Sequence, residues 1–77
     1  MNTCFVCESG WILIGKEARR TDDTIALSDA AIVRRWDNGK GIGGIAKREY
    51  KDEYTLDAVG DVAIRLGKVL FEIPCEW

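Results

Sequence analysis

Short apolar runs recur along the chain, and glycines and polar residues separate them at a spacing typical of small antiparallel β-proteins. The clearest run is residues 24–28, where Ile25 and Leu27 alternate with other residues and therefore share one face of a strand. We predict strands at residues 4–8, 11–18, 24–28, 30–36, 54–56, 62–66 and 69–73. Turn residues such as Asp37-Asn38-Gly39 lie between them, and Pro74 ends the last one. The pattern predicts an all-β fold, a small and strongly bent antiparallel sheet or barrel of roughly five to seven short strands.

Two segments and one glycine add detail to this prediction. Residues 29–36 are also compatible with a helix, because Ala30 and Ala31 lie near their start. Residues 41–48 are compatible with one or two helical turns, although Gly43 and Gly44 each cost about 1 kcal/mol relative to alanine. We therefore allow at most one short helix, which would make the fold a β-rich α+β domain. Gly15 lies inside a predicted strand and indicates a bulge or a sharp bend.

The length and charge of the chain narrow the class of protein. Seventy-seven residues form a single small β-rich domain, residues 1–77. A domain of this size buries only about 60% of its unfolded surface, so we expect a homo-oligomer. The formal net charge of −2 disfavours non-specific binding to nucleic acid. No apolar run approaches the length of a membrane span, and we expect a cytoplasmic protein without a membrane partner.

The cysteines form a Cys4-x-x-Cys7 pair and a distant Cys75. Residues three apart on a strand point to opposite faces, so Cys4 and Cys7 are poorly placed to share a ligand. A zinc site needs four ligands, and the sequence contains no histidine. We interpret the three cysteines as small buried side chains, with a metal site or a disulfide as less favoured alternatives. The sequence predicts no cofactor and no metal.

The most informative segment is Arg34-Arg35-Trp36, which is followed by a loop containing Gly39, Lys40 and Gly41. Glycines allow backbone N–H groups to approach an anion, and lysine and arginine add positive charge. On an uninterrupted strand, Arg34 and Trp36 share one face and Arg35 points away with Val33. We predict that this segment binds an anion or another ligand. The alternatives are a flexible hairpin loop and an arginine–tryptophan pair that shields the edge of the core.

Residues 39–44 also fit the pattern G-x-G-x-x-G, which is typical of dinucleotide-binding folds. That reading requires a βαβ unit within a larger parallel sheet, which this chain is too short to form. We therefore reject it.

Several short motifs resemble a family of short, mostly uncharacterised proteins of tailed phages and prophages. The motifs are the small turn Ser9-Gly10, Ile14-Gly15-Lys16, Ile25-Ala26-Leu27-Ser28-Asp29-Ala30, Arg34-Arg35-Trp36, Ile42-Gly43-Gly44-Ile45-Ala46 and Phe71-Glu72-Ile73-Pro74-Cys75. The segment after the tryptophan departs from the family, which usually has leucines and few glycines there. The resemblance implies an accessory protein that acts inside a host cell, and it supplies no catalytic residues.

The sequence favours a non-catalytic binding protein, because it lacks histidine and shows no paired acidic residues. Together with the resemblance to phage proteins, this implies a protein that occupies a host protein or sequesters an anionic small molecule such as a nucleotide, with counter-defence as the expected role. One alternative is a small β-barrel that binds nucleic acid through Arg34, Arg35, Trp36, Lys40 and Arg65. Another is a structural protein that assembles into a ring. Trp11 and Trp77 either pack at the rim of the core or contribute to an interface between subunits.

Overall fold

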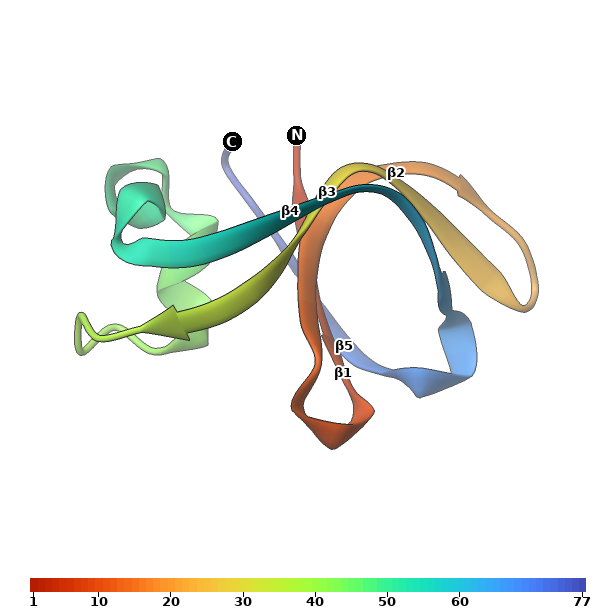
Figure 1. Cartoon of the computed structure of the whole chain (residues 1–77), viewed down its shortest axis with the longest axis horizontal. Helices are drawn as coiled ribbons and strands as arrows, with labels where there is room; N and C mark the ends of the chain where they lie inside the picture. Colours follow the sequence, from red (N-terminus) through yellow and green to blue (C-terminus); the bar gives the residue numbers. More distant parts are fainter.

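The computed structural model describes residues 1–77 and contains one five-stranded sheet in which every pairing is antiparallel (Figure 1). The strands are β1 (Thr3–Cys7), β2 (Ile12–Arg20), β3 (Thr24–Trp36), β4 (Tyr54–Arg65) and β5 (Val69–Pro74). Their order across the sheet is β4-β3-β2-β1-β5. Four short 3-10 segments connect them, η1 (Glu8–Gly10), η2 (Ile42–Ala46), η3 (Arg48–Glu53) and η4 (Leu66–Lys68). The predicted all-β fold is confirmed.

Two predicted strand breaks are wrong, one at Asp29 and one between residues 56 and 62. In the structure β3 and β4 each continue through these positions. The expected break at Asp29 is a local irregularity in the pairing of β3, and Asp29 adopts a positive φ of 49° within it. The neighbouring strands supply hydrogen-bond partners on either side, so the strand continues and the helical alternative at residues 29–36 is excluded. The expected helix at residues 41–48 is only the 3-10 segment η2. Its two glycines, Gly43 and Gly44, do not favour a regular α-helix.

The sheet changes direction along a line that crosses its three longest strands. The pairing register shifts beside Gly15 on β2 and around Ala30 on β3. Ala30 pairs with Gly60 on β4, and Gly60 has a φ of 79°, which favours glycine. The bend predicted at Gly15 is therefore confirmed, and it extends through β3 to β4. Figure 1 shows β3 and β4 as two long ribbons that arch over the shorter β1 and β5.

This bend gives the domain two small cores on opposite faces of one sheet. The adjacent residues Cys4 and Phe5 are both 0% exposed, although they point to opposite faces of β1. The first core contains Cys4, Ile14, Ala31, Val33, Ile45, Tyr54 and Cys75. The second contains Phe5, Cys7, Ile25, Leu27 and Ala30. Strand β3 thus changes its buried face between Ala30 and Ala31, which explains why its apolar pattern looks interrupted.

The cysteines are buried and free, as predicted. Cys4 lies in the first core and Cys7 in the second, which confirms that they point to opposite faces. Burial raises the pKa of the Cys4 thiol to about 12, so this group stays protonated and unreactive at neutral pH.

Segments η2 and η3 cover the open side of the first core. Ile45 of η2 is fully buried, and its carbonyl accepts a hydrogen bond of 2.8 Å from the indole Nε1 of Trp77. Trp77 therefore packs at the rim of this core, which was one of the two roles predicted for it.

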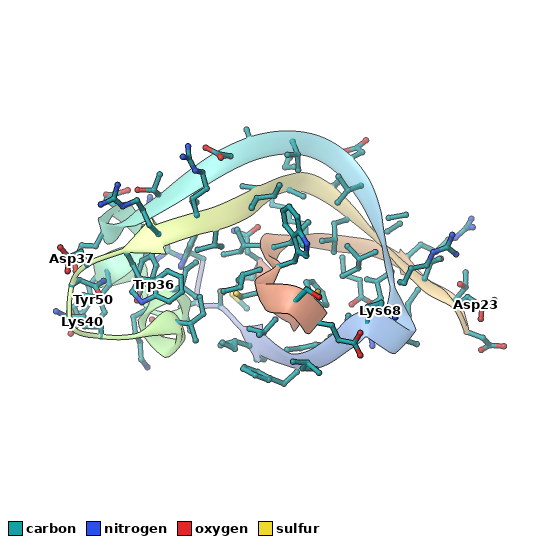
Figure 2. The ribbon with its side chains drawn as sticks, turned by 60° about the horizontal axis from the view of Figure 1, so that its bottom comes forward. Asp23, Trp36, Asp37, Lys40, Tyr50 and Lys68 are labelled. Carbon is teal, nitrogen blue, oxygen red and sulfur yellow. The ribbon has the colours of Figure 1, made fainter.

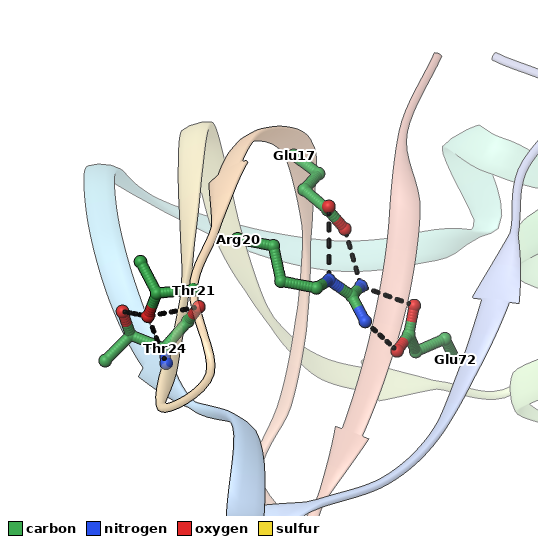
Figure 3. Close-up of polar contacts among 5 residues, drawn as sticks. All are labelled: Glu17, Arg20, Thr21, Thr24 and Glu72. Atoms are coloured by element: carbon green, nitrogen blue, oxygen red, sulfur yellow. Dashed lines mark hydrogen bonds and ion pairs between the residues drawn. The ribbon is translucent and has the colours of Figure 1, made fainter.

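An ion pair holds the other end of the bent sheet (Figure 3). Arg20, at the end of β2, donates to both carboxylate oxygens of Glu72 on β5, at 2.9 and 3.1 Å, and it also donates to Glu17. Strand β1 lies between β2 and β5 in the sheet, so this contact connects two strands that share no backbone pairing. Strands β4 and β5 remain the two outer edges, and the fold is a strongly curled open sheet.

Candidate ligand-binding site

A pocket of about 470 Å³ lies where β3 ends and β4 begins. Its lining consists of Arg35, Trp36, Asp37, Asn38, Glu53 and Thr55. The pairing of β3 with β4 brings these residues together, because Arg35 lies opposite Thr55 and Trp36 lies opposite Tyr54. Two of the predicted site residues, Arg35 and Trp36, therefore line one pocket. Figure 2 shows Trp36 and Asp37 at this end of the molecule.

The predicted placement of Arg34 beside Trp36 is wrong. The register of β3 on β4 shifts between Val33 and Arg35, which is a β-bulge. Paired residues share a face, so Val33 and Trp36 lie on the face of the first core with their partners Leu56 and Tyr54.

Both arginines lie on the opposite face of β3. Arg35 pairs with Thr55, and Arg34 forms an ion pair with Asp57, two residues further along β4. The bulge thus places two consecutive arginines on the same face, which strict alternation does not predict.

The two arginines differ in their partners. The Nε of Arg34 lies 3.3 Å from the carboxylate of Asp57, so Arg34 already has a carboxylate partner within the chain. Arg35 is exposed and makes no ion pair with any carboxylate of the chain. Arg35 is therefore the arginine that can offer its guanidinium to an external anion at this pocket.

Trp36 is fixed by the core behind it. Its ring centroid lies 5.9 Å from that of Tyr54, with the planes tilted by 36°. The hydroxyl of Tyr54 donates a hydrogen bond to the carbonyl of Gly41, which ties the loop after β3 to the start of β4. The indole is partly buried against the first core, which holds Trp36 in place where it lines the pocket at the end of β3.

The loop of Gly39, Lys40 and Gly41 lies outside the pocket lining, and contacts with Asn38 and with η3 hold it in place. The backbone N–H of Lys40 donates to the side-chain oxygen of Asn38 at 3.0 Å. The Lys40 ammonium lies 4.6 Å from the centre of the Tyr50 ring and 4.0 Å from the carboxylate of Glu53. Figure 2 shows Lys40 and Tyr50 close together at the tip of this loop.

Gly39 and Gly41 have φ angles of 72° and 66°, and neither lines the pocket. The structure therefore does not bring Gly39, Lys40 and Gly41 together with Arg35 and Trp36 around one anion.

Four pocket residues were not among the predicted site residues, namely Asp37, Asn38, Glu53 and Thr55. The side-chain nitrogen of Asn38 is buried and has no hydrogen-bond partner, which is costly for an amide. Asn38 has the appearance of an ordinary turn residue in the sequence, and Thr55 enters the pocket only through the pairing of β3 with β4. No sequence signal marks Thr55 or Glu53 before that register is known.

The lining of the pocket combines polar, charged and aromatic groups. It offers a guanidinium, an amide, a hydroxyl and an aromatic ring, and Asp37 and Glu53 contribute the carboxylates. No group of three histidine, cysteine or acidic side chains is arranged to hold a metal ion. The structure contains no helix long and apolar enough to cross a membrane.

Comparisons with protein-family models, with curated proteins and with solved structures found no match to this chain. The resemblance to small phage proteins therefore rests on the short motifs of the sequence alone.

Proposed function

We propose that this protein is a non-catalytic binding protein that takes a small anionic ligand with a planar ring, of the nucleotide class, in the pocket of Arg35 and Trp36. The observation that carries the proposal is the position of Arg35, an exposed guanidinium that forms no ion pair and lines the same pocket as Trp36 at the end of β3. A guanidinium binds phosphate or carboxylate oxygens through two parallel hydrogen bonds, and an indole stacks on a planar ring. The pocket volume of about 470 Å³ falls within the range of small-molecule sites.

The buried amide of Asn38 supports a ligand that also carries hydrogen-bond acceptors. Its nitrogen has no partner, so a small movement of the loop that brings this group to a ligand oxygen would satisfy it. The hydroxyl of Thr55 can donate or accept and lies opposite Arg35 on the neighbouring strand. Sequestration of such a ligand is compatible with the accessory role that the phage resemblance implies.

We favour a small molecule over nucleic acid for a specific reason. The arginines of β3 share their face with Asp57, which pairs with Arg34. Nucleic acid requires a series of uncompensated cations along one surface, and the chain carries a net charge of −2.

Isothermal titration with inorganic phosphate, AMP and ATP tests the proposal. We expect at least one nucleotide to bind, and Arg35→Ala to weaken that binding by about 1.5–3 kcal/mol, as for a lost charge-assisted hydrogen bond. Trp36→Leu should also weaken it and should abolish the change in tryptophan fluorescence that stacking causes. Far-ultraviolet circular dichroism of each variant checks that the fold is retained.

Arg34→Ala is the matched control, because Arg34 is the neighbouring arginine, pairs with Asp57 and does not line the pocket. Its affinity for the nucleotide should stay close to that of the wild type. Failure of all three probes to bind would contradict the proposal. Equal losses for Arg34→Ala and Arg35→Ala would also contradict it, because a general effect of charge would then explain both.

A further inference from the structure

A second concave site lies at the opposite end of the sheet, between the β1–β2 turn and the β4–β5 turn. It has a volume of about 330 Å³, and its lining consists of Cys7, Glu8, Ser9, Trp11, Leu13, Ile64, Arg65 and Lys68. Half of these residues are hydrophobic. None of them belongs to the pocket of Arg35 and Trp36, so this is a separate site.

The apolar part of the site is an open extension of the second core. Leu13 and Ile64 both pack against that core, from β2 and from the end of β4. Trp11 is 58% exposed, which is unusual for so large an apolar side chain. Because Trp11 and Leu13 are two residues apart in extended backbone, they lie on the same face. An apolar group placed here would cover the indole and the two aliphatic side chains together.

The polar part of the site is an ion pair across its rim. The ammonium of Lys68 in η4 lies 3.4 Å from the carboxylate of Glu8 in η1. Both side chains are well exposed, at 68% and 51%, so the pair is weak and opens readily in water. Figure 2 shows Lys68 at the turn where β4 passes into β5.

Arg65 also lines the site and makes no ion pair within the chain. The rim thus carries two cations, Arg65 and Lys68, against the single carboxylate of Glu8.

We propose that this second pocket binds a small amphiphilic anion, an aromatic or aliphatic carboxylate whose apolar group covers Trp11 and whose carboxylate replaces Glu8 as the partner of Lys68. The apolar walls supply the burial of the ligand body, and the excess positive charge of the rim selects an anionic head group. The exchange requires no new charge to be buried, because one carboxylate leaves Lys68 as another arrives.

If the ligand replaces Glu8 at Lys68, neutralising either member of this ion pair changes the affinity for the ligand, but in opposite directions. Lys68→Gln removes the cation that the ligand needs, and we expect it to weaken binding about tenfold. Glu8→Gln removes the competing carboxylate, and we expect it to strengthen binding. Trp11→Ala removes the aromatic wall and should weaken binding about tenfold.

The experiment follows backbone amide shifts by nuclear magnetic resonance during titration with 3-phenylpropionate. The uncharged 3-phenylpropionamide and the small anion acetate serve as matched probes, since each lacks one of the two recognised features. We expect 3-phenylpropionate to bind with shifts centred on residues of η1, η4 and Trp11, and we expect both matched probes to bind much more weakly.

Two outcomes would overturn the proposal. One is the absence of binding by 3-phenylpropionate, and the other is equal affinity for the acid and its amide, which would indicate an apolar patch without charge recognition. Glu8→Gln and Lys68→Gln changing the affinity in the same direction would equally refute the exchange at Lys68. Arg35→Ala should leave this binding unchanged, so failure here and failure of the nucleotide pocket can be distinguished.

Discussion

Gly15 on β2 packs its backbone directly against Ala30 on β3, at the point where the sheet bends. A Cβ atom added at Gly15 would lie 3.1 Å from both the Cα and the Cβ of Ala30 and 3.3 Å from the Cβ of Leu27. Contacts this short are tighter than ordinary packing and require Ala30 and Leu27 to give way slightly. The close approach of β2 and β3 therefore depends on the absence of a side chain at position 15. The bend that separates the two cores depends on the same close approach.

We expect Gly15→Ala to lower the free energy of unfolding by about 1–2 kcal/mol, because overpacking against β3 outweighs the reduced entropy of the unfolded chain. Gly15→Val should cost more, since its branched side chain meets the same backbone. Urea denaturation followed by circular dichroism measures both effects. Gly67→Ala is the control, because a Cβ at Gly67 meets no atom within 4 Å. Equal stability of the Gly15→Ala variant and the wild type would contradict a steric role for this glycine.

The elements of this fold that the sequence predicts are those set by local patterns. The alternation of Ile25 and Leu27 identifies the first half of β3, and the Asp37-Asn38-Gly39 turn identifies its end. Strand periodicity also places Cys4 and Cys7 on opposite faces, as the two cores confirm. These features depend on residues close together in the chain.

The features that the sequence does not predict depend on register between distant segments. The bulge at Arg34 and Arg35 exists because the register of β3 shifts against β4. Neither arginine by itself predicts this shift. The same register brings Thr55 to Arg35, twenty residues away, and completes the candidate pocket. The sequence therefore identifies only Arg35 and Trp36 among the pocket residues, and strand alternation places Arg34 on the wrong face.

The predicted self-association depends on β5, an outer edge of the sheet. Leu70 and Phe71 are 63% and 50% exposed there, and exposed apolar side chains on an edge strand favour contact with another chain. We expect sedimentation velocity to detect association that strengthens with protein concentration, and Phe71→Lys to reduce it strongly. Val59→Lys, which adds the same charge on the other edge strand, β4, is the control and should have little effect. A wild-type protein that stays monomeric at every concentration would refute this prediction.

The carboxylate of Glu76 connects the last residues of the chain to the segments η2 and η3. Its Oε1 atom accepts a hydrogen bond of 3.1 Å from the ammonium of Lys47, and its Oε2 atom accepts one of 3.4 Å from the backbone N–H of Arg48. The hydrogen bond from Lys47, followed by that from Arg48, lowers the pKa of Glu76. A lowered pKa in the folded state means that the ionised carboxylate is stabilised by folding.

The lowered pKa of Glu76 makes the free energy of unfolding depend on pH. The contribution of Glu76 to stability is present above the pKa of the carboxyl in the unfolded chain, about 4.3, and is lost as the pH falls through the lower pKa of the folded state. Glu76→Gln cannot ionise, so it should be less stable than the wild type at pH 7 and equally stable once both carboxyls are neutral, near pH 2. Urea midpoints measured across this range test the expectation, and the comparison cancels the titration of all other groups.

Glu49→Gln is the matched control, because Glu49 is a neighbouring carboxylate of η3 that takes part in no ion pair. Its difference from the wild type should be small at every pH. A loss of stability in Glu76→Gln that stays constant from pH 7 to pH 2 would show that the shape of the side chain matters there and its charge does not. A loss that disappears with acidification would instead identify the charged contact with Lys47 and Arg48 as the one that holds η2 and η3 over the first core.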